Sequence, residues 1–227
     1  MMTAPLSVRV PLLGEWYVGA DGTEPGHELA FDFMRLDRRL KATRVSAWRE
    51  LLTAVPYEDY LGWGQPIVSP FAGRVVAAQD GWEERPQSYL MKLAGNVRSA
   101  FSAEEKRRFA ALEATQTGDI LPLAGNHLVI ESIEHPEVYA FLAHARNGSL
   151  RVASGDVVEA LQPVAEVGDS GQSLVPHLHF HLMSSPNPLA RQLIPFSFSA
   201  YEVQVDGQWT PRYDTKPTRR QRIRSVG

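Results

Sequence analysis

Residues 168–183 read GDSGQSLVPHLHFHLM, and this stretch contains three of the chain's seven histidines, His177, His179 and His181. Successive side chains on a β-strand point to opposite faces of a sheet. A strand over this stretch therefore places the three imidazoles together on one face. The other face is apolar and consists of Leu178, Phe180 and Leu182. The pattern predicts a strand with one face packed on a core, while the other carries groups that serve as metal ligands and general bases.

The spacing of the three histidines limits how they can share a metal ion. On a strand, residues two apart are separated by roughly 6.6 Å, and residues four apart by about 13 Å. A zinc–nitrogen bond is only about 2.1 Å long, so His177 and His181 cannot bind the same ion. At most two of the three histidines are ligands of one metal, and the remaining ligands must come from elsewhere in the chain.

Composition restricts the class of protein. The chain has 227 residues, of which 44% are hydrophobic and 22% charged, as is typical of a globular protein with a sizeable core. The formal net charge of -3 gives no reason to expect a nucleic-acid partner. Because cysteine is absent, any metal must be held by nitrogen and oxygen. No stretch approaches the roughly 20 apolar residues of a membrane span, and no signal peptide is visible at the start.

Short β-branched runs, separated by Gly, Asn and Asp turns, recur along the chain. This spacing predicts a mainly β protein built as an antiparallel sandwich or barrel. The runs at 67–68 and 75–76 lie on either side of Pro70 and Gly73 and therefore predict a hairpin. The GDSG segment at 168–171 has no strand–turn–helix context for a nucleophilic serine, so we interpret it as a turn.

Two segments interrupt the β pattern. The first, at about 35–60, is charged and loosely helical, and the second, at about 82–120, contains a capping-box pattern at 102–105 that predicts a helix. We therefore predict a single β domain over residues 8–210 with these two insertions. The residues that follow, 211–227, are predicted to form a basic and solvated tail.

Two further residues are candidates for chemistry. Asp32 stands between Phe31 and Phe33 in a run that otherwise looks buried, and a buried carboxylate needs a partner. That partner is either a metal ion or an arginine. His144 follows the apolar run at 139–143 and is either a core histidine at a strand end or a second catalytic imidazole.

With these pieces in chain order, the sequence resembles the lysostaphin/LytM-type zinc metallopeptidases, which cut the peptide part of peptidoglycan. The resemblance covers most of residues 10–185 outside the two insertions, and PHLHF preceded by GxSG is its most specific part. It implies a barrel-sandwich hybrid fold, also described as a duplicated hybrid motif. The matching blocks are GHELAFDF, WGQPIVSPFAGRVVAAQDG, GNHLVIES, FLAHARNGS, VASGDVVEALQPVAEVGDSG and PHLHFHL.

The resemblance implies a role for each matching residue. Asp32 and His179 match an aspartate and a histidine ligand of one Zn²⁺ ion, and His27 is the candidate for the remaining ligand. His177 matches a catalytic histidine that orients or deprotonates the zinc-activated water. His144 matches a second catalytic histidine that stabilises the oxyanion. One histidine of the strand then binds metal, and its neighbour performs chemistry.

The sequence departs from the family pattern at two positions. The first ligand usually stands four residues before the aspartate, whereas His27 is five residues before Asp32. On a regular strand, this offset puts the two on opposite faces, unless a bulge or loop intervenes. Glu28 has the four-residue spacing and could serve as an oxygen ligand instead. His181 stands where the family usually has Glu or Gln, and the sequence gives it no role.

The resemblance implies a zinc endopeptidase that acts on peptidoglycan stem peptides or cross-bridges, and a location in the cell envelope. Two alternatives remain open at this point. One is a catalytically degenerate relative that binds peptidoglycan or activates another hydrolase. The other is a biotinyl/lipoyl-type carrier, because Lys92 lies in a Met-Lys pair and the spacing of residues in the β segments resembles that of such domains. In those carriers, however, the lysine sits at the tip of a tight hairpin.

Overall fold

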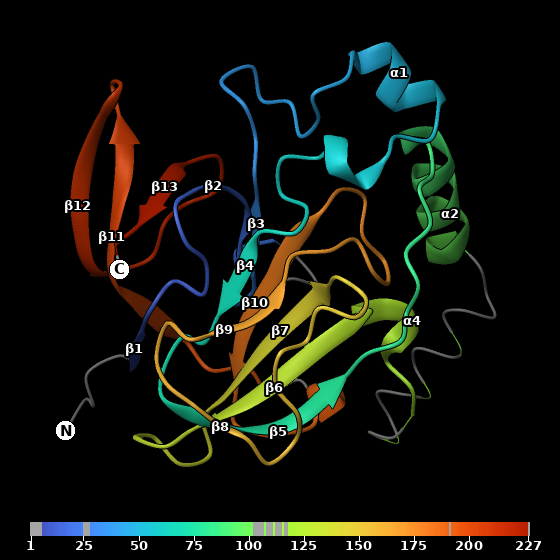
Figure 1. The fold of residues 1–227 in the computed structure, drawn as a ribbon. Helices are drawn as coiled ribbons and strands as arrows, with labels where there is room; N and C mark the ends of the chain where they lie inside the picture. The colour runs from blue at the N-terminus through green and yellow to red at the C-terminus, as the bar shows by residue number, and fades with distance from the viewer. Residues whose placement is uncertain are drawn as a thin grey trace.

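The computed structural model describes residues 6–24, 28–101, 118–190 and 192–226, together with residues 107, 111 and 115. It confirms the predicted fold class, because the described chain is mainly β, with one large sheet and few helices (Figure 1). In this part of the chain, no helix is both long enough and apolar enough to cross a membrane.

The main sheet has the strand order β1-β11-β13-β2-β3-β10-β7-β6-β5-β8, with β12 paired to β11. All neighbours are antiparallel except β1 and β11. Its strands are β1 (Leu6–Val8), β2 (Glu15–Asp21), β3 (Phe31–Met34), β5 (Gly73–Gln79), β6 (Asn126–Ser132), β7 (Tyr139–Ala145), β8 (Val157–Val158), β10 (His177–Met183), β11 (Phe196–Val205), β12 (Gln208–Thr215) and β13 (Arg222–Ser225).

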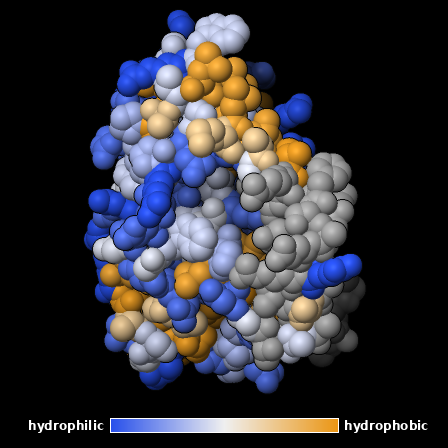
Figure 2. All heavy atoms as spheres, turned by 90° about the vertical axis from the view of Figure 1, so that its right-hand side faces the viewer, coloured by the Kyte–Doolittle hydropathy of each residue, from blue (hydrophilic) through white to orange (hydrophobic). Residues whose placement is uncertain are grey.

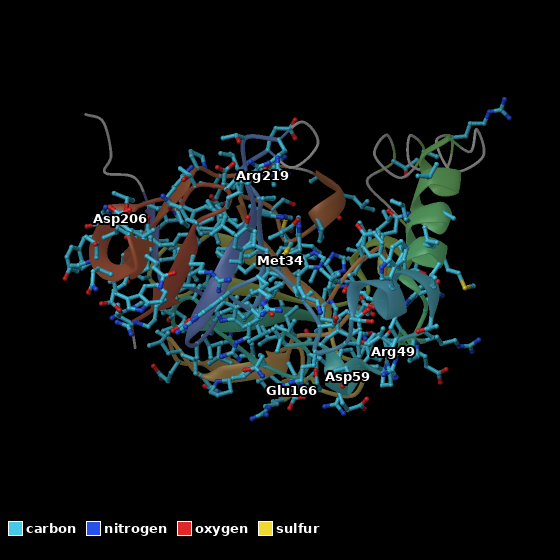
Figure 3. The ribbon with its side chains drawn as sticks, turned by 90° about the horizontal axis from the view of Figure 1, so that it is seen from above. Met34, Arg49, Asp59, Glu166, Asp206 and Arg219 are labelled. Carbon is cyan, nitrogen blue, oxygen red and sulfur yellow. The ribbon has the colours of Figure 1, made fainter. Side chains whose placement is uncertain are left out.

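A second, two-stranded sheet pairs β4 (Pro66–Val68) with β9 (Pro163–Glu166). The helices of the described chain are short or peripheral (Figure 1). They are α1 (Ala47–Leu52), α2 (Tyr89–Phe101) and α4 (Leu121–Ala124), with the 3-10 turns η1 (Tyr57–Asp59) and η2 (Pro188–Ala190). Seen from above, Met34 at the end of β3 lies between the β11–β12 hairpin, marked by Asp206, and the α1 region, marked by Arg49 (Figure 3).

The apolar face of β10 packs into the main core, as the alternation in its sequence predicts. Leu178, Phe180 and Leu182 are completely buried there. Phe180 contacts the ring of Phe196 at 5.3 Å between centroids, and this aromatic cluster continues to β3 through Phe31. Burial of these rings anchors β3 and β10 side by side. The opposite face of the two strands is thereby held in one position.

We expect Phe180→Ala to lower the free energy of unfolding by about 3–5 kcal/mol, because the truncation leaves a cavity among packed rings. Urea unfolding followed by circular dichroism measures this change. Trp48 is 74% exposed, so Trp48→Ala is the matched control and should change stability by no more than about 0.5 kcal/mol. Equal effects of the two substitutions would contradict the assignment of Phe180 to the core.

The structure corrects two sequence-based predictions. The predicted hairpin at 67–76 was wrong, because β4 pairs with β9 while β5 pairs with β6 and β8. The prediction of a solvated tail was wrong for β13, which inserts between β11 and β2 and completely buries Ile223. The helix predicted after the capping box at 102–105 falls largely outside the described residues.

Candidate active site

Three neighbouring strands bring the candidate residues together. In the pairing of β3 with β10, Asp32 stands directly opposite His179, although 147 residues separate them in sequence. On the other side of β10, His179 stands opposite Ala143, the residue before His144. Residues directly opposite each other on antiparallel strands share a face. Asp32 and His179 therefore meet on the polar face of the sheet.

Asp32 is surrounded by imidazoles. Its Oδ1 lies 2.8 Å from Nδ1 of His179 and 3.7 Å from Nε2 of His177. Burial favours the neutral acid, but the electrostatic interaction with His177 and the hydrogen bond with His179 outweigh it, so the pKa of Asp32 is held well below its usual range. Asp32 is thus an ionised carboxylate, and the partners that the sequence left open include two histidines.

His144 reaches this face through a β-bulge. Two β7 residues, Ala143 and His144, stand opposite the single β6 residue His127, and His144 has a φ of +62°. This backbone conformation costs a non-glycine residue about 1–2 kcal/mol. In a regular strand, His144 would point to the face opposite Ala143, into the core. The bulge turns its ring toward β10 instead, 4.6 Å from the His177 ring between centroids.

The hydrogen bonds of His144 and His177 determine which ring nitrogen carries the proton. Nδ1 of His144 lies 2.7 Å from the carbonyl oxygen of Ser170, and Nδ1 of His177 lies 2.9 Å from that of Val175. A carbonyl oxygen can only accept, so both Nδ1 atoms are protonated and both Nε2 atoms have a free lone pair when the rings are neutral. Burial and repulsion by His177 and His179 hold the pKa of His144 well below its usual value, so this ring is neutral at pH 7.

His181 contacts the candidate metal ligand. Its Nδ1 lies 3.1 Å from Nε2 of His179, and its ring is nearly buried. A histidine that binds a metal through one nitrogen commonly hydrogen-bonds through the other, and that bond fixes its orientation. His181 therefore occupies the position from which the ring of His179 is oriented. Sequence spacing placed it on the correct face but gave no sign of this contact.

His27 lies outside the described residues, so its position stays a prediction. Glu28 is exposed in the turn before β3. The alternation that would put residues 27 and 32 on opposite faces does not apply, since β3 begins at Phe31 and Leu29 has a φ of +58°. Among the described residues, a turn at Glu28 and Leu29 thus precedes the strand that carries Asp32.

Among the residues described, no group of three or more His, Cys, Asp or Glu side chains is arranged to hold a metal ion. Two donors of suitable chemistry are nevertheless in place. Asp32 contributes an ionised carboxylate and His179 an imidazole nitrogen 2.8 Å away. This nitrogen-and-oxygen pair fits zinc, which needs at least one further ligand from the protein.

A cavity of about 570 Å³ lies beside the site, between the insertion and the GDSG segment. Its lining includes Trp82, Glu84 and Met91 from the insertion, and Ser173, whose hydroxyl lies 3.0 Å from Nδ1 of His177. Figure 2 views this side of the molecule, where apolar side chains gather toward the top of the face; α1 exposes Trp48 and Leu52 to solvent. The described part of the insertion therefore forms one wall of a cavity whose opposite wall includes Ser173, a hydrogen-bond neighbour of His177.

The structure also bears on the carrier alternative. Lys92 belongs to α2, and its side chain is only 8% exposed because it is ion-paired with Asp169. A carrier lysine must be accessible to the enzyme that modifies it. This environment opposes the carrier reading.

Comparison with known proteins gives a family match for part of the chain. Residues 111–190 match the family model described as Peptidase family M23. This match confirms the resemblance to lysostaphin/LytM-type peptidases that the sequence blocks indicate. It contains His144, His177 and His179, whereas Asp32 lies outside it. A comparison with curated proteins found no match.

Solved structures of several peptidases are similar to this chain. One is the catalytic domain of the prophage-encoded M23 protein EnpA from Enterococcus faecalis, in a point-mutant form, at 18% identity and a TM-score of 0.41, covering 76% of this chain and 84% of that chain. Another is the catalytic domain of the antimicrobial peptidase lysostaphin from Staphylococcus simulans. It has 17% identity and a TM-score of 0.37, and the match covers 75% of this chain and 80% of that chain. A third is a zinc-containing peptidase from Vibrio cholerae. It has 19% identity and a TM-score of 0.35, and the match covers 78% of this chain and 35% of that chain.

Proposed function

We propose that this protein is a zinc-dependent endopeptidase that hydrolyses peptide bonds of peptidoglycan stem peptides or cross-bridges. The observation that carries the proposal is the pairing of ionised Asp32 with His179, beside His144 and His177, whose Nδ1 atoms each face a backbone carbonyl. The family M23 match over residues 111–190 supports peptide-bond hydrolysis as the reaction.

Asp32 and His179 would hold the zinc ion together with His27, or with Glu28 in its place. Zinc at this position would supply a Lewis acid that polarises the substrate carbonyl and activates water. His181 would keep the ring of His179 in its binding orientation through the 3.1 Å contact. In this proposal three residues bind the metal, and His181 orients one of them.

His177 is the proposed general base. Its Nδ1 proton is held by the carbonyl of Val175, so its Nε2, 3.7 Å from Asp32 Oδ1, is free to accept a proton from the attacking water. The resulting positive charge is stabilised by the neighbouring carboxylate of Asp32. The proton can then pass to the amine that leaves when the peptide bond breaks.

His144 acts in a more restricted way than the family resemblance implies. Because the neutral ring is protonated at Nδ1, its Nε2 cannot donate a hydrogen bond to an oxyanion. It can do so only after taking up a separate proton from solvent, which the negative charge developing on the substrate would favour. We therefore propose that His144 stabilises the oxyanion as a cation formed during the reaction.

Digestion of purified peptidoglycan sacculi tests the proposed function. We expect the protein to release peptide fragments that carry new amino and carboxyl ends, identified by mass spectrometry. A chelator should stop the release, and added zinc should restore it. The degenerate alternative predicts that the protein sediments with sacculi without releasing fragments. That outcome, obtained with protein shown to contain zinc, would contradict the proposal that the protein is an enzyme.

A further inference from the structure

One loop supplies the acceptors that orient both candidate catalytic histidines. We define the histidine-orienting loop as residues 169–175, which lie between β9 and β10. Near its start, the carbonyl of Ser170 accepts from Nδ1 of His144 at 2.7 Å. Near its end, the carbonyl of Val175 lies 2.9 Å from Nδ1 of His177, and the Ser173 hydroxyl lies 3.0 Å from the same atom. The same loop therefore contacts both rings.

The start of the histidine-orienting loop is anchored on the β-sheet. The Ser170 hydroxyl donates to the carbonyl of Ala145 at 2.8 Å and accepts from the backbone N–H of Asn126 at 2.9 Å. Gly171 lies so close to Gly125 that an added Cβ would stand 2.4 Å from the Gly125 nitrogen. These contacts hold residues 170 and 171 against the sheet.

A single ammonium group connects the two ends. Lys92, from α2 in the insertion, forms an ion pair with the carboxylate of Asp169 and donates to the carbonyl of Leu174 at 3.3 Å. The side chains of Lys92 and Asp169 are only 8% and 1% exposed. Removing one partner of a buried ion pair leaves an uncompensated charge, which costs far more than breaking a surface pair. The loop is therefore clamped by a residue that lies 77 positions earlier in the chain.

Two tyrosines enclose the ammonium group on its other side. The Nζ atom of Lys92 lies 5.9 Å from the ring centre of Tyr57 and 5.8 Å from that of Tyr60, which is within cation–π range. Burial, and then the charge of Asp169, raise the pKa of Tyr60 to about 12. Both rings therefore remain neutral beside the ion pair, and they restrict where Nζ can lie.

We propose that Lys92 is a positioning residue: it clamps residues 169–175 so that the Nδ1–H groups of His144 and His177 stay bonded to their carbonyls. The insertion would then be a working part of the active site rather than an appendage of the domain. The effect on catalysis rests on the proposed function, whereas the effect on the two imidazoles does not.

The test compares the full-length protein with Lys92→Met, Lys92→Arg and the double variant Lys92→Met/Asp169→Asn. Leu93→Ala, an exposed site on the same helix, is the control. The first readout is the ¹H–¹⁵N spectrum of the histidine rings at one neutral pH. We expect the Nδ1–H signals of His144 and His177 to shift or broaden together in Lys92→Met, to be largely retained in Lys92→Arg, and to be unchanged in Leu93→Ala.

The double variant separates positioning from stability. It removes both charges, so thermal stability should recover toward the wild-type value. The ring signals should nevertheless remain perturbed, because the bond to the Leu174 carbonyl is still missing. Turnover of peptidoglycan peptides should fall about 10²-fold in Lys92→Met with zinc content unchanged, since displacements of about 1 Å have effects of this size.

The outcomes distinguish this inference from the proposed function. Wild-type ring signals in Lys92→Met, or recovery of both signals and stability in the double variant, would overturn the positioning role. If the ring signals change as expected while the wild-type protein cleaves no peptidoglycan, the positioning role stands and the proposed function fails. If Lys92→Met does not fold, the double variant and Lys92→Arg still decide the question.

Discussion

His179→Ala is expected to abolish both zinc binding and peptidoglycan hydrolysis. Wild-type protein should carry about one zinc ion per chain, and the variant close to none, because a site of three protein ligands loses one of its nitrogens. His179 is also a residue that Asp32 contacts at 2.8 Å, so its removal takes away one hydrogen-bond partner of that carboxylate. Elemental analysis of dialysed protein, together with sacculus digestion, measures the two effects.

His135→Ala provides the matched control, since His135 is exposed in the connection between β6 and β7 and is not a proposed ligand or catalytic residue. It should retain both zinc and activity. Circular dichroism shows whether His179→Ala is folded, which separates loss of a ligand from loss of the structure. A folded His179→Ala protein with the wild-type zinc content would remove His179 from the metal site and, with it, the proposed division of roles on β10.

His177→Ala is expected to lower kcat by about 10²–10⁴-fold while leaving zinc content unchanged. The substitution removes the Nε2 that lies 3.7 Å from Asp32 Oδ1 and is free to accept a proton. It does not remove a proposed metal ligand. Single-turnover kinetics on a soluble peptide released from sacculi would place the loss in the chemical step.

Ser173→Ala is a milder test of the same histidine. It deletes one of the two groups near Nδ1 of His177 but leaves the carbonyl of Val175. Its effect on kcat should therefore be clearly smaller than that of His177→Ala. Loss of zinc in His177→Ala would show that this histidine is a ligand, and activity equal to wild type would show that it is not the general base.

The features of the candidate site that depend on the residue pattern within a single strand could be predicted from the sequence. The alternation along β10 placed Leu178 and Phe180 in the core and the histidines on the opposite face, and both follow from the two-residue repeat of an extended backbone. Asp32 could be recognised because a carboxylate between two buried phenylalanines needs a partner. The identity of that partner could not be recognised, because it lies on a strand 147 residues away.

Other features had no local signal. The bulge at His144 depends on how β6 and β7 pair, and a stretch such as YAFLAHA does not encode it. The hairpin predicted at 67–76 failed because Ile67 is completely buried against β9 rather than against its neighbour in sequence. The basic C-terminal segment joins the sheet because Ile223 has a place in the core between β11 and β2.

The sequence by itself determined which face of each strand is apolar, which residue types are available to a metal, and the order of the family blocks. These properties follow from backbone geometry and side-chain chemistry, which act over a few residues. Tertiary structure alone decided that Asp32 meets His179, that the ring of His144 turns toward His177, and that Lys92 pairs with Asp169 in the loop whose carbonyls face both of those rings. Such contacts depend on burial and charge pairing between distant segments, and no local pattern specifies those partners.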